Sequence, residues 1–188
     1  YILGFPLLAA WGTLGGAVLN KVKAIFGGRV RIAVSGASAL QPDIDLFFRA
    51  CGIEILEMYG MTETAGVVCA RLPHENKFKT LGPALPGCEV QLRTEKGEVI
   101  KERGKKGIAW HKGPNIMKGY YKNPEKTREI MDENGWLNSG DLLIQTQSGE
   151  FAFAGREKDT VVLMGGENIE PVPIEGKIKT SSYISQVM

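Results

Sequence analysis

Two short apolar segments separated by one short helix shape the first half of the 188-residue chain. The segments RVRIAVSG (29–36) and IEILEMYG (53–60) both have the pattern of strands. Between them, PDIDLFFRACG (42–52) has Pro42 at a first-turn position and two aspartates at the positive end of a helix. Strand, helix and strand in this order predict a βαβ unit with parallel strands. The carboxyl ends of both strands then meet at one sheet edge, where open α/β sheets bind ligands.

The pattern changes from about residue 80, where short apolar runs alternate with Gly and Pro turns. One helix interrupts these runs, at 123–135, with Asn123 as its expected N-cap and Pro124 at its first position. The predicted short strands lie in LGPALPGCEVQL (81–92), GEVI (97–100), KKGIAWHKG (105–113), GEFAFAGR (149–156) and DTVVLM (159–164). The fold class is therefore expected to be α/β: part of a parallel βαβ sheet followed by an antiparallel sheet or distorted β-barrel.

Charge and cysteine content narrow the classes of partner. The net charge of +2 and the scattered basic residues indicate neither nucleic acid nor an acidic membrane as a partner. Cys51, Cys69 and Cys88 are too few and too far apart for a disulfide framework or a zinc site, which favours a reduced, cytoplasmic compartment. His74 and His111 have no partner motif, so surface or structural roles are expected.

The opening segment, residues 1–19, carries no charge. Its length is compatible with a membrane span, but Pro6 and four glycines favour a buried segment of a larger protein. It has neither an initiator Met nor a basic region that would make it a signal peptide. We expect the chain to be a piece of something longer.

Four short stretches carry candidate chemistry. In SGASAL (35–40), small residues let the backbone approach a ligand closely, although an ordinary tight turn has the same composition. In YGMTE (59–63), a hydroxyl beside a carboxylate is suited to a phosphate oxygen and its magnesium ion. Asp141, in GWLNSGDL (135–142), could accept both hydroxyls of a ribose or be a turn residue. Arg156, in GREKD (155–159), offers a planar fork of donors in what could also be a solvated loop.

In this order and spacing the four stretches resemble the adenylate-forming superfamily, which includes acyl-CoA synthetases, luciferases and the adenylation domains of peptide synthetases. GPNIMKGYYKNPEKT (113–127) and the segment 155–175 add to the resemblance, the latter looking most like long-chain fatty acid CoA ligases. The resemblance implies three parts: residues 1–78 as the late part of a large N-terminal α/β domain, 79–156 as a β-barrel-like subdomain, and 157–188 as the hinge and the start of a small α+β C-terminal domain.

The resemblance also implies roles for the candidate residues. Thr62 is expected to bind a phosphate oxygen of ATP, and Glu63 to hold Mg²⁺. Asp141 is expected to bind the ribose hydroxyls, supported by Arg156. The other expected positions are Gly36, Ala37 and Ser38 along the adenine and acyl pocket, Tyr59, Gly60 and Met61 near the adenine, Lys158 at the domain hinge, and Gly165 and Gly166 in the coenzyme A loop.

The implied reaction joins a fatty carboxylate to ATP as acyl-AMP and then transfers the acyl group to coenzyme A. The family's Gly/Ser/Thr-rich phosphate loop and its late lysine have no counterpart among these 188 residues, so the isolated chain is expected to be inactive. Small molecules are the expected partners, without nucleic acid. A peripheral membrane contact, the oligomeric state and the acyl chain length are left open. The alternatives are a ligase of another carboxylic acid and a non-catalytic, nucleotide-binding truncated product.

Overall fold

The structure is a computed structural model that describes residues 12–162, 168–169 and 171–178, together with residues 181, 183, 184 and 187. The first eleven residues of the uncharged opening segment lie outside the described part, as do the two glycines of the expected coenzyme A loop, Gly165 and Gly166. Helix α2 (Gly12–Ile25) takes up the rest of that segment and extends beyond it. None of the helices in the described ranges is long and apolar enough to span a membrane.

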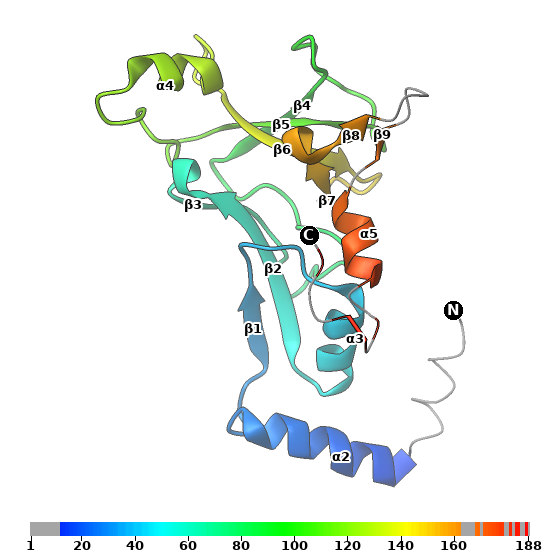
Figure 1. Cartoon of the computed structure of the whole chain (residues 1–188). Coiled ribbons are helices and arrows are strands. Elements are labelled where there is room, and N and C mark those ends of the chain that lie inside the picture. Colours follow the sequence, from blue (N-terminus) through cyan, green and yellow to red (C-terminus); the bar gives the residue numbers. More distant parts are fainter. Residues whose placement is uncertain are drawn as a thin grey trace.

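The first sheet contains the expected βαβ unit (Figure 1). Strands β1 (Ile32–Ser35) and β2 (Glu54–Met61) are parallel and are joined by helix α3 (Pro42–Ala50). Strand β2 continues beyond the end of β1 and pairs there with β3 (Gly66–Ala70), which is antiparallel to it and was not predicted. The carboxyl half of β2 is thereby carried away from β1 toward the second sheet.

The second sheet is antiparallel, with the order β4 (Glu89–Arg93), β5 (Lys106–Lys112), β6 (Leu137–Gln145) and β7 (Phe151–Arg156). It confirms the expected change from parallel to antiparallel pairing, and across residues 12–162 it is an open sheet, not a closed barrel. The predicted strand at 81–92 is a strand only from Glu89 on, and the one at 97–100 is reduced to an isolated bridge at Val99.

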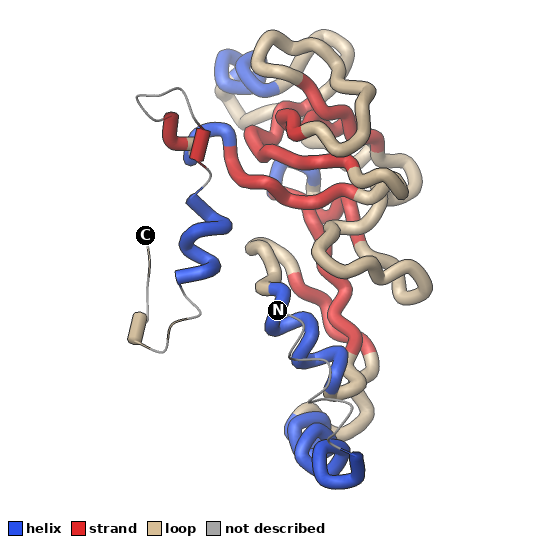
Figure 2. The backbone as a smooth tube through the Cα atoms, turned by 90° about the vertical axis from the view of Figure 1, so that its right-hand side faces the viewer, coloured by secondary structure: helices blue, strands red, loops and turns tan. Residues whose placement is uncertain are grey.

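Helix α4 (Pro124–Ile130) interrupts the second sheet and begins where the sequence predicts it, but it ends at Ile130 and not at residue 135. Asn123 is its N-cap, because its Oδ1 accepts a hydrogen bond from the backbone N–H of Lys126 at 3.0 Å. Two short 3-10 helices follow strands: η1 (Thr62–Thr64) follows β2, and η2 (Glu157–Asp159) follows β7. After η2 come β8 (Val161–Val162), β9 (Asn168–Ile169) and α5 (Pro171–Ile178). Figure 2 shows β8, β9 and α5 to one side of the two sheets.

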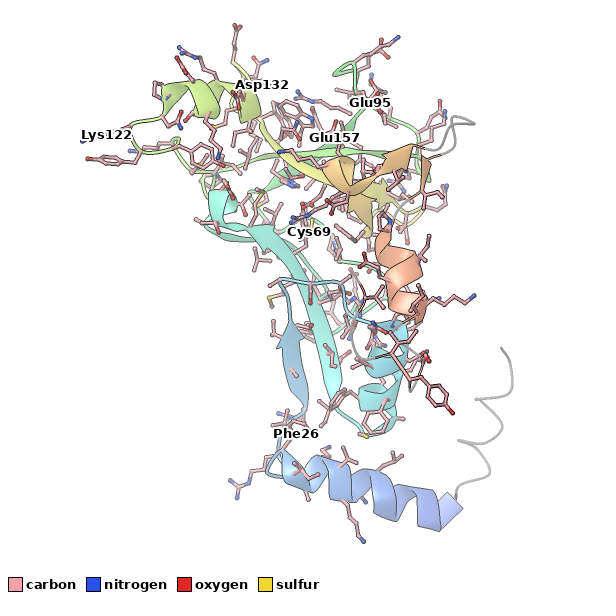
Figure 3. The ribbon with its side chains drawn as sticks, viewed as in Figure 1. Phe26, Cys69, Glu95, Lys122, Asp132 and Glu157 are labelled. Atoms are coloured by element: carbon pink, nitrogen blue, oxygen red, sulfur yellow. The ribbon has the colours of Figure 1, made fainter. Side chains whose placement is uncertain are left out.

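One hydrophobic core joins the two sheets. Cys69 of β3 is fully buried in it and lies in the crowded region between them (Figure 3). The segment before β4 binds both sheets through its backbone, since Leu81 N–H donates to Phe151 O of β7 and Ala70 N–H of β3 donates to Pro83 O. The buried members of the core are Tyr59, Val68, Cys69, Leu81, Leu92, Ala109, Leu143 and Phe151. This packing fixes the carboxyl half of β2 against the second sheet.

A buried ion network fixes the loop after β1. Arg71 is 2% exposed and donates to Asp45 of α3 and to Glu57 of β2, each at 2.6 Å. The other oxygen of Glu57 accepts the backbone N–H of Leu40 at 3.0 Å. Burial raises the pKa of the Glu57 carboxyl, while the Leu40 N–H and the Arg71 charge lower it. The network therefore ties Leu40, at the end of the loop after β1, to the middle of β2.

Candidate active site

The two sheets meet at a hydrogen-bonded group centred on the Asp141 carboxylate. Tyr59 of β2 donates its hydroxyl to Asp141 Oδ2 at 2.8 Å, and Arg156 Nε of β7 donates to Oδ1 at 2.9 Å. Asp141 and Arg156 are direct cross-strand partners in β6 and β7. Asp141 is 5% exposed, whereas the Arg156 side chain is largely exposed. Each carboxylate oxygen accepts one bond and keeps a lone pair, so the pair of oxygens can still accept two neighbouring hydroxyls.

A bulge in β6 places Asp141. Ile108 of β5 pairs with Leu142 and Trp110 pairs with Asn138, so a two-residue step on β5 faces a four-residue step on β6. Side chains within the bulge hold its backbone: Ser139 Oγ donates to Ala109 O at 2.8 Å and accepts the Asp141 N–H at 3.1 Å. Bulges bend a strand and redirect side chains, and they are common beside active sites. The alternative for Asp141, a residue in a turn, is wrong, because Asp141 lies at an interruption within strand β6.

His111 of β5 lies behind Tyr59, fully buried, with its Nε2 3.2 Å from the Tyr59 oxygen. Because the Tyr59 proton goes to Asp141, the geometry favours an imidazole that is protonated on Nε2 and donates to the Tyr59 oxygen. Nδ1 of His111 is buried and has no hydrogen-bond partner among the described residues. Burial lowers the pKa of His111 to about 4, and it raises the pKa of Tyr59, with the Asp141 charge adding to the rise. Both groups are neutral at neutral pH.

The turn after β2 exposes the Thr62 side chain and half-buries Glu63. Gly60 is required there by close packing, because a Cβ at this position would lie 1.8 Å from the Gly66 carbonyl oxygen of β3. Thr64 is fully buried and holds the turn, since its hydroxyl accepts the Met61 N–H at 3.0 Å and donates to Gly66 O at 2.7 Å. Thr62, which is exposed, and Glu63, which is half-buried, thus precede Thr64 on a turn held by hydrogen bonds.

The Glu63 carboxylate has one oxygen engaged and one available. Oε1 accepts the Tyr120 hydroxyl at 2.7 Å, and Oε2 has no hydrogen-bond partner within the described ranges. Those ranges contain no cluster of three or more His, Cys, Asp or Glu side chains that could hold a metal ion. A single free carboxylate oxygen fits Mg²⁺ in the form in which this ion accompanies nucleotides, held by one or two carboxylates, phosphate oxygens and water. The donor set therefore fits magnesium bound together with a nucleotide.

The loop after β1 lies beside the same part of β2. A Cβ on Gly36 would lie 3.2 Å from the Met58 carbonyl oxygen, one residue before Tyr59. Ala37 has a φ of +69°, a left-handed conformation that is uncommon for a residue with a side chain and is often associated with functional sites. Gly36, Ala37 and Ser38 are all exposed. These exposed residues thus follow β1 directly, and Gly36 approaches the backbone of β2 one residue before Tyr59.

The structure therefore brings together some of the predicted residues and leaves others apart. Tyr59, Asp141 and Arg156 form one hydrogen-bonded group, and Glu63 follows Tyr59 by four residues on the same β2–η1 segment. Among the described residues the side chains of Glu63 and Asp141 share no hydrogen-bond partner, since Glu63 is bound by Tyr120 and Asp141 by Tyr59 and Arg156. Lys158 is exposed in η2, two residues after the end of β7.

Comparison with known proteins assigns the family. The family model described as "AMP-binding enzyme" matches residues 8–121, more than half of the chain. The chain belongs to this family. The AMP-binding match includes the loop after β1, the turn after β2 and the strand that carries His111.

Two plant relatives and one solved structure illustrate the similarity to AMP-binding enzymes. "Long chain acyl-CoA synthetase 7, peroxisomal" of Arabidopsis thaliana is 40% identical over 182 residues, covering 95% of this chain and 26% of its own length. "Long-chain-fatty-acid--[acyl-carrier-protein] ligase AEE15, chloroplastic", from the same plant, is 36% identical over 168 residues, covering 84% of this chain and 23% of its own length. The o-succinylbenzoate CoA synthetase of Bacillus subtilis, solved with its acyl-adenylate intermediate, has a TM-score of 0.77 at 28% identity, covering 83% of this chain and 32% of that chain. This chain spans about a quarter of the length of the curated relatives that it matches.

Two contacts at the site were not predicted from the sequence. His111 was interpreted as a surface or structural histidine, and its contact with Tyr59 joins residues 52 positions apart. Tyr120 lies in the stretch 113–127, which helped to identify the family but received no role of its own. Its contact with Glu63 joins residues 57 positions apart, which no local pattern predicts. The signal that the sequence did offer was the place of Tyr120 in that motif.

Proposed function

We propose that this chain supplies the nucleotide-binding part of an ATP-dependent, AMP-forming ligase for long-chain fatty acids. The observation that carries the proposal is the buried Asp141 carboxylate, held by Tyr59 and Arg156 and still able to accept two hydroxyls, in a chain of the AMP-binding family. A ribose presents such a pair of hydroxyls. The names of the relatives with 36–40% identity support a long-chain fatty acid as the carboxylate.

In this proposal, the first half-reaction joins the fatty carboxylate to the α-phosphorus of ATP and releases pyrophosphate. Asp141 accepts the ribose hydroxyls, and Arg156 and Tyr59 keep its carboxylate oriented. Gly36, Ala37 and Ser38 border the adenine and the acyl group with exposed backbone. A carboxylate needs positioning more than deprotonation, so a rigid site is the main contribution of these residues.

Thr62 and Glu63 are proposed to act at the phosphates. The exposed Thr62 hydroxyl donates to a phosphate oxygen, and the free Oε2 of Glu63 binds Mg²⁺. When bound, magnesium neutralises the charge that develops on the phosphates. The second half-reaction transfers the acyl group from AMP to a thiol, releasing AMP.

We also propose that the chain changes domain near residues 78 and 156. Lys158 is then the hinge residue, and Gly165 and Gly166, outside the described residues, form the loop that meets the thiol substrate. Coenzyme A is the proposed thiol, and the relative named as an acyl-carrier-protein ligase makes a carrier protein the alternative. Cytoplasmic localisation stays a prediction, since the two plant relatives are named as chloroplastic and peroxisomal.

A second candidate substrate class is a different carboxylic acid, which the similarity to an o-succinylbenzoate CoA synthetase favours. ATP–pyrophosphate exchange by the full-length protein, with palmitate, octanoate, benzoate and o-succinylbenzoate in turn, separates the two. We expect palmitate to support the fastest exchange, and AMP release on adding coenzyme A to be faster than on adding an acyl carrier protein. Exchange fastest with an aromatic acid would favour the second candidate, and no exchange with any acid would overturn ligase activity.

A further inference from the structure

The segment 113–127, between β5 and the middle of α4, has no role in the proposed chemistry, yet it lies against the turn that carries Glu63. Asn115 Nδ2 donates to Thr64 O at 2.9 Å, and the Met117 N–H donates to Glu63 O at 2.8 Å. These two bonds hold the backbone of η1. The third contact, from the Tyr120 hydroxyl to Glu63 Oε1 at 2.7 Å, is the one made to the carboxylate itself.

The local sequence holds Tyr120 in place. The Tyr120 N–H donates to Thr127 Oγ1 in α4 at 2.9 Å, and the Thr127 hydroxyl donates to Asn123 O at 2.9 Å. A Cβ on Gly119 would lie 2.8 Å from Thr127 Cγ2, and the φ of +144° at this position suits glycine. Gly119, the Asn123 cap and Thr127 therefore fix the backbone from which Tyr120 reaches Glu63.

We propose that Tyr120 is a positioning residue for the cation bound with the nucleotide; this rests on the proposed role of Glu63. By occupying Oε1, the Tyr120 hydroxyl fixes the carboxylate rotamer and directs Oε2, which has no partner among the described residues, toward the cation. The phenol is the donor in this contact and the carboxylate is the acceptor.

Two tyrosine variants in the full-length protein test this proposal. Tyr120→Phe removes only the hydroxyl that contacts Glu63. Tyr121→Phe is the matched control, because it removes the same atom from the next residue, whose side chain is 87% exposed. Figure 3 shows that the neighbouring Lys122 points outward from this loop. The partner variant is Glu63→Gln, alone and combined with Tyr120→Phe.

Two measurements are made on each variant. The first is the Mg²⁺ concentration that gives half-maximal pyrophosphate release at saturating ATP and palmitate. The second needs no turnover: the dissociation constant of ATP by calorimetry, with Mg²⁺ and with EDTA. For Tyr120→Phe we expect the Mg²⁺ concentration for half-maximal release and the dissociation constant of ATP with Mg²⁺ each to rise about tenfold. The dissociation constant of ATP in EDTA should not change. The unchanged value in EDTA also shows that the variant is folded.

The combined variant separates a positioning role from an independent one. If Tyr120 acts through Glu63, the double variant is no worse than Glu63→Gln alone. Equal values for Tyr120→Phe and Tyr121→Phe, additive losses in the double variant, or wild-type ATP binding that is the same with Mg²⁺ and EDTA would each overturn the proposal. Failure of the proposed function looks different: the wild-type protein then binds ATP with Mg²⁺ but releases no pyrophosphate with any acid.

Discussion

Tyr59→Phe tests the buried group that joins the two sheets. The substitution keeps the ring of a side chain that is 9% exposed and removes one oxygen. That oxygen donates to Asp141 at 2.8 Å and lies 3.2 Å from His111 Nε2. Without it, Asp141 keeps only Arg156 as a side-chain donor, and both nitrogens of His111 are left without hydrogen-bond partners among the described residues.

The expected loss of stability is the sum of two contributions. A hydrogen bond to a charged group contributes about 1.5–3 kcal/mol, and a buried donor left unsatisfied costs about 1–3 kcal/mol. Taking the lower part of each range, because the cavity is small and Asp141 keeps Arg156, we expect Tyr59→Phe to lower the free energy of unfolding by about 3 kcal/mol. His111→Leu alone removes one bond but also a buried polar ring, so its cost is expected to be below about 1.5 kcal/mol.

The decisive comparison is the double variant, measured by equilibrium urea denaturation of the full-length protein at pH 7.5. In Tyr59→Phe/His111→Leu no histidine nitrogen remains to be satisfied, so the double loss should be smaller than the sum of the single losses by about 1 kcal/mol. Tyr121→Phe, at an exposed site, is the control and should change stability by less than about 0.5 kcal/mol. A loss below about 0.5 kcal/mol for Tyr59→Phe, or strictly additive losses, would mean that the Tyr59 hydroxyl does not satisfy Asp141 and His111 together.

Three further predictions concern pH, catalysis and the hinge. Folding lowers the pKa of His111 from 6.5 to about 4, so the unfolded chain binds a proton more readily than the folded one, and the free energy of unfolding falls as the pH falls below about 6.5. Between pH 7 and pH 5 this fall is about 2 kcal/mol, and His111→Leu should remove that much of the pH dependence in urea titrations. Glu63→Gln should slow magnesium-dependent pyrophosphate release at saturating ATP, whereas Asp141→Ala should mainly raise KM for ATP; identical kinetic patterns would contradict this division of roles. Lys158→Pro should leave adenylation within about tenfold and lower thioester formation by at least ~10², while Lys158→Ala should change neither; equal losses in both half-reactions would exclude the hinge.

Local signals in the sequence were sufficient for the parts of the fold that local chemistry determines. The βαβ unit was predicted from alternating apolar residues and a helix that begins with proline, and its two strands are parallel as expected. The N-cap was predicted from Asn123 followed by Pro124, and Asn123 accepts the Lys126 N–H. Strand β3 was missed because GVVCA is only five residues long and begins two residues after Thr64, so it merges with the turn that follows β2. The edges of β4 were misjudged because residues 81–88 bridge two sheets and so cannot continue one strand.

The candidate site was predictable as a set of residue types but not as a geometry. The sequence indicated the Asp141 carboxylate, whereas the bulge that places it arises from unequal spacing on β5 and β6, two strands about 30 residues apart. The contacts of Tyr59 with Asp141 and of Tyr120 with Glu63 span 82 and 57 positions. Pairings at such separations depend on the packing of the two sheets, and no local pattern encodes them.

The most direct test of the central claim, that Asp141 is the ribose site of an AMP-forming ligase, is a comparison of ATP with 2′,3′-dideoxy-ATP. Dissociation constants are measured by calorimetry for the full-length wild-type protein and for Asp141→Ala. Two hydroxyls bonded to a carboxylate are each worth about tenfold, so the wild-type protein should bind ATP about 100-fold more tightly than the dideoxy nucleotide, and Asp141→Ala should bind both equally. Equal binding of the two nucleotides by the wild-type protein, or discrimination that survives in Asp141→Ala, would mean that Asp141 does not bind the ribose hydroxyls.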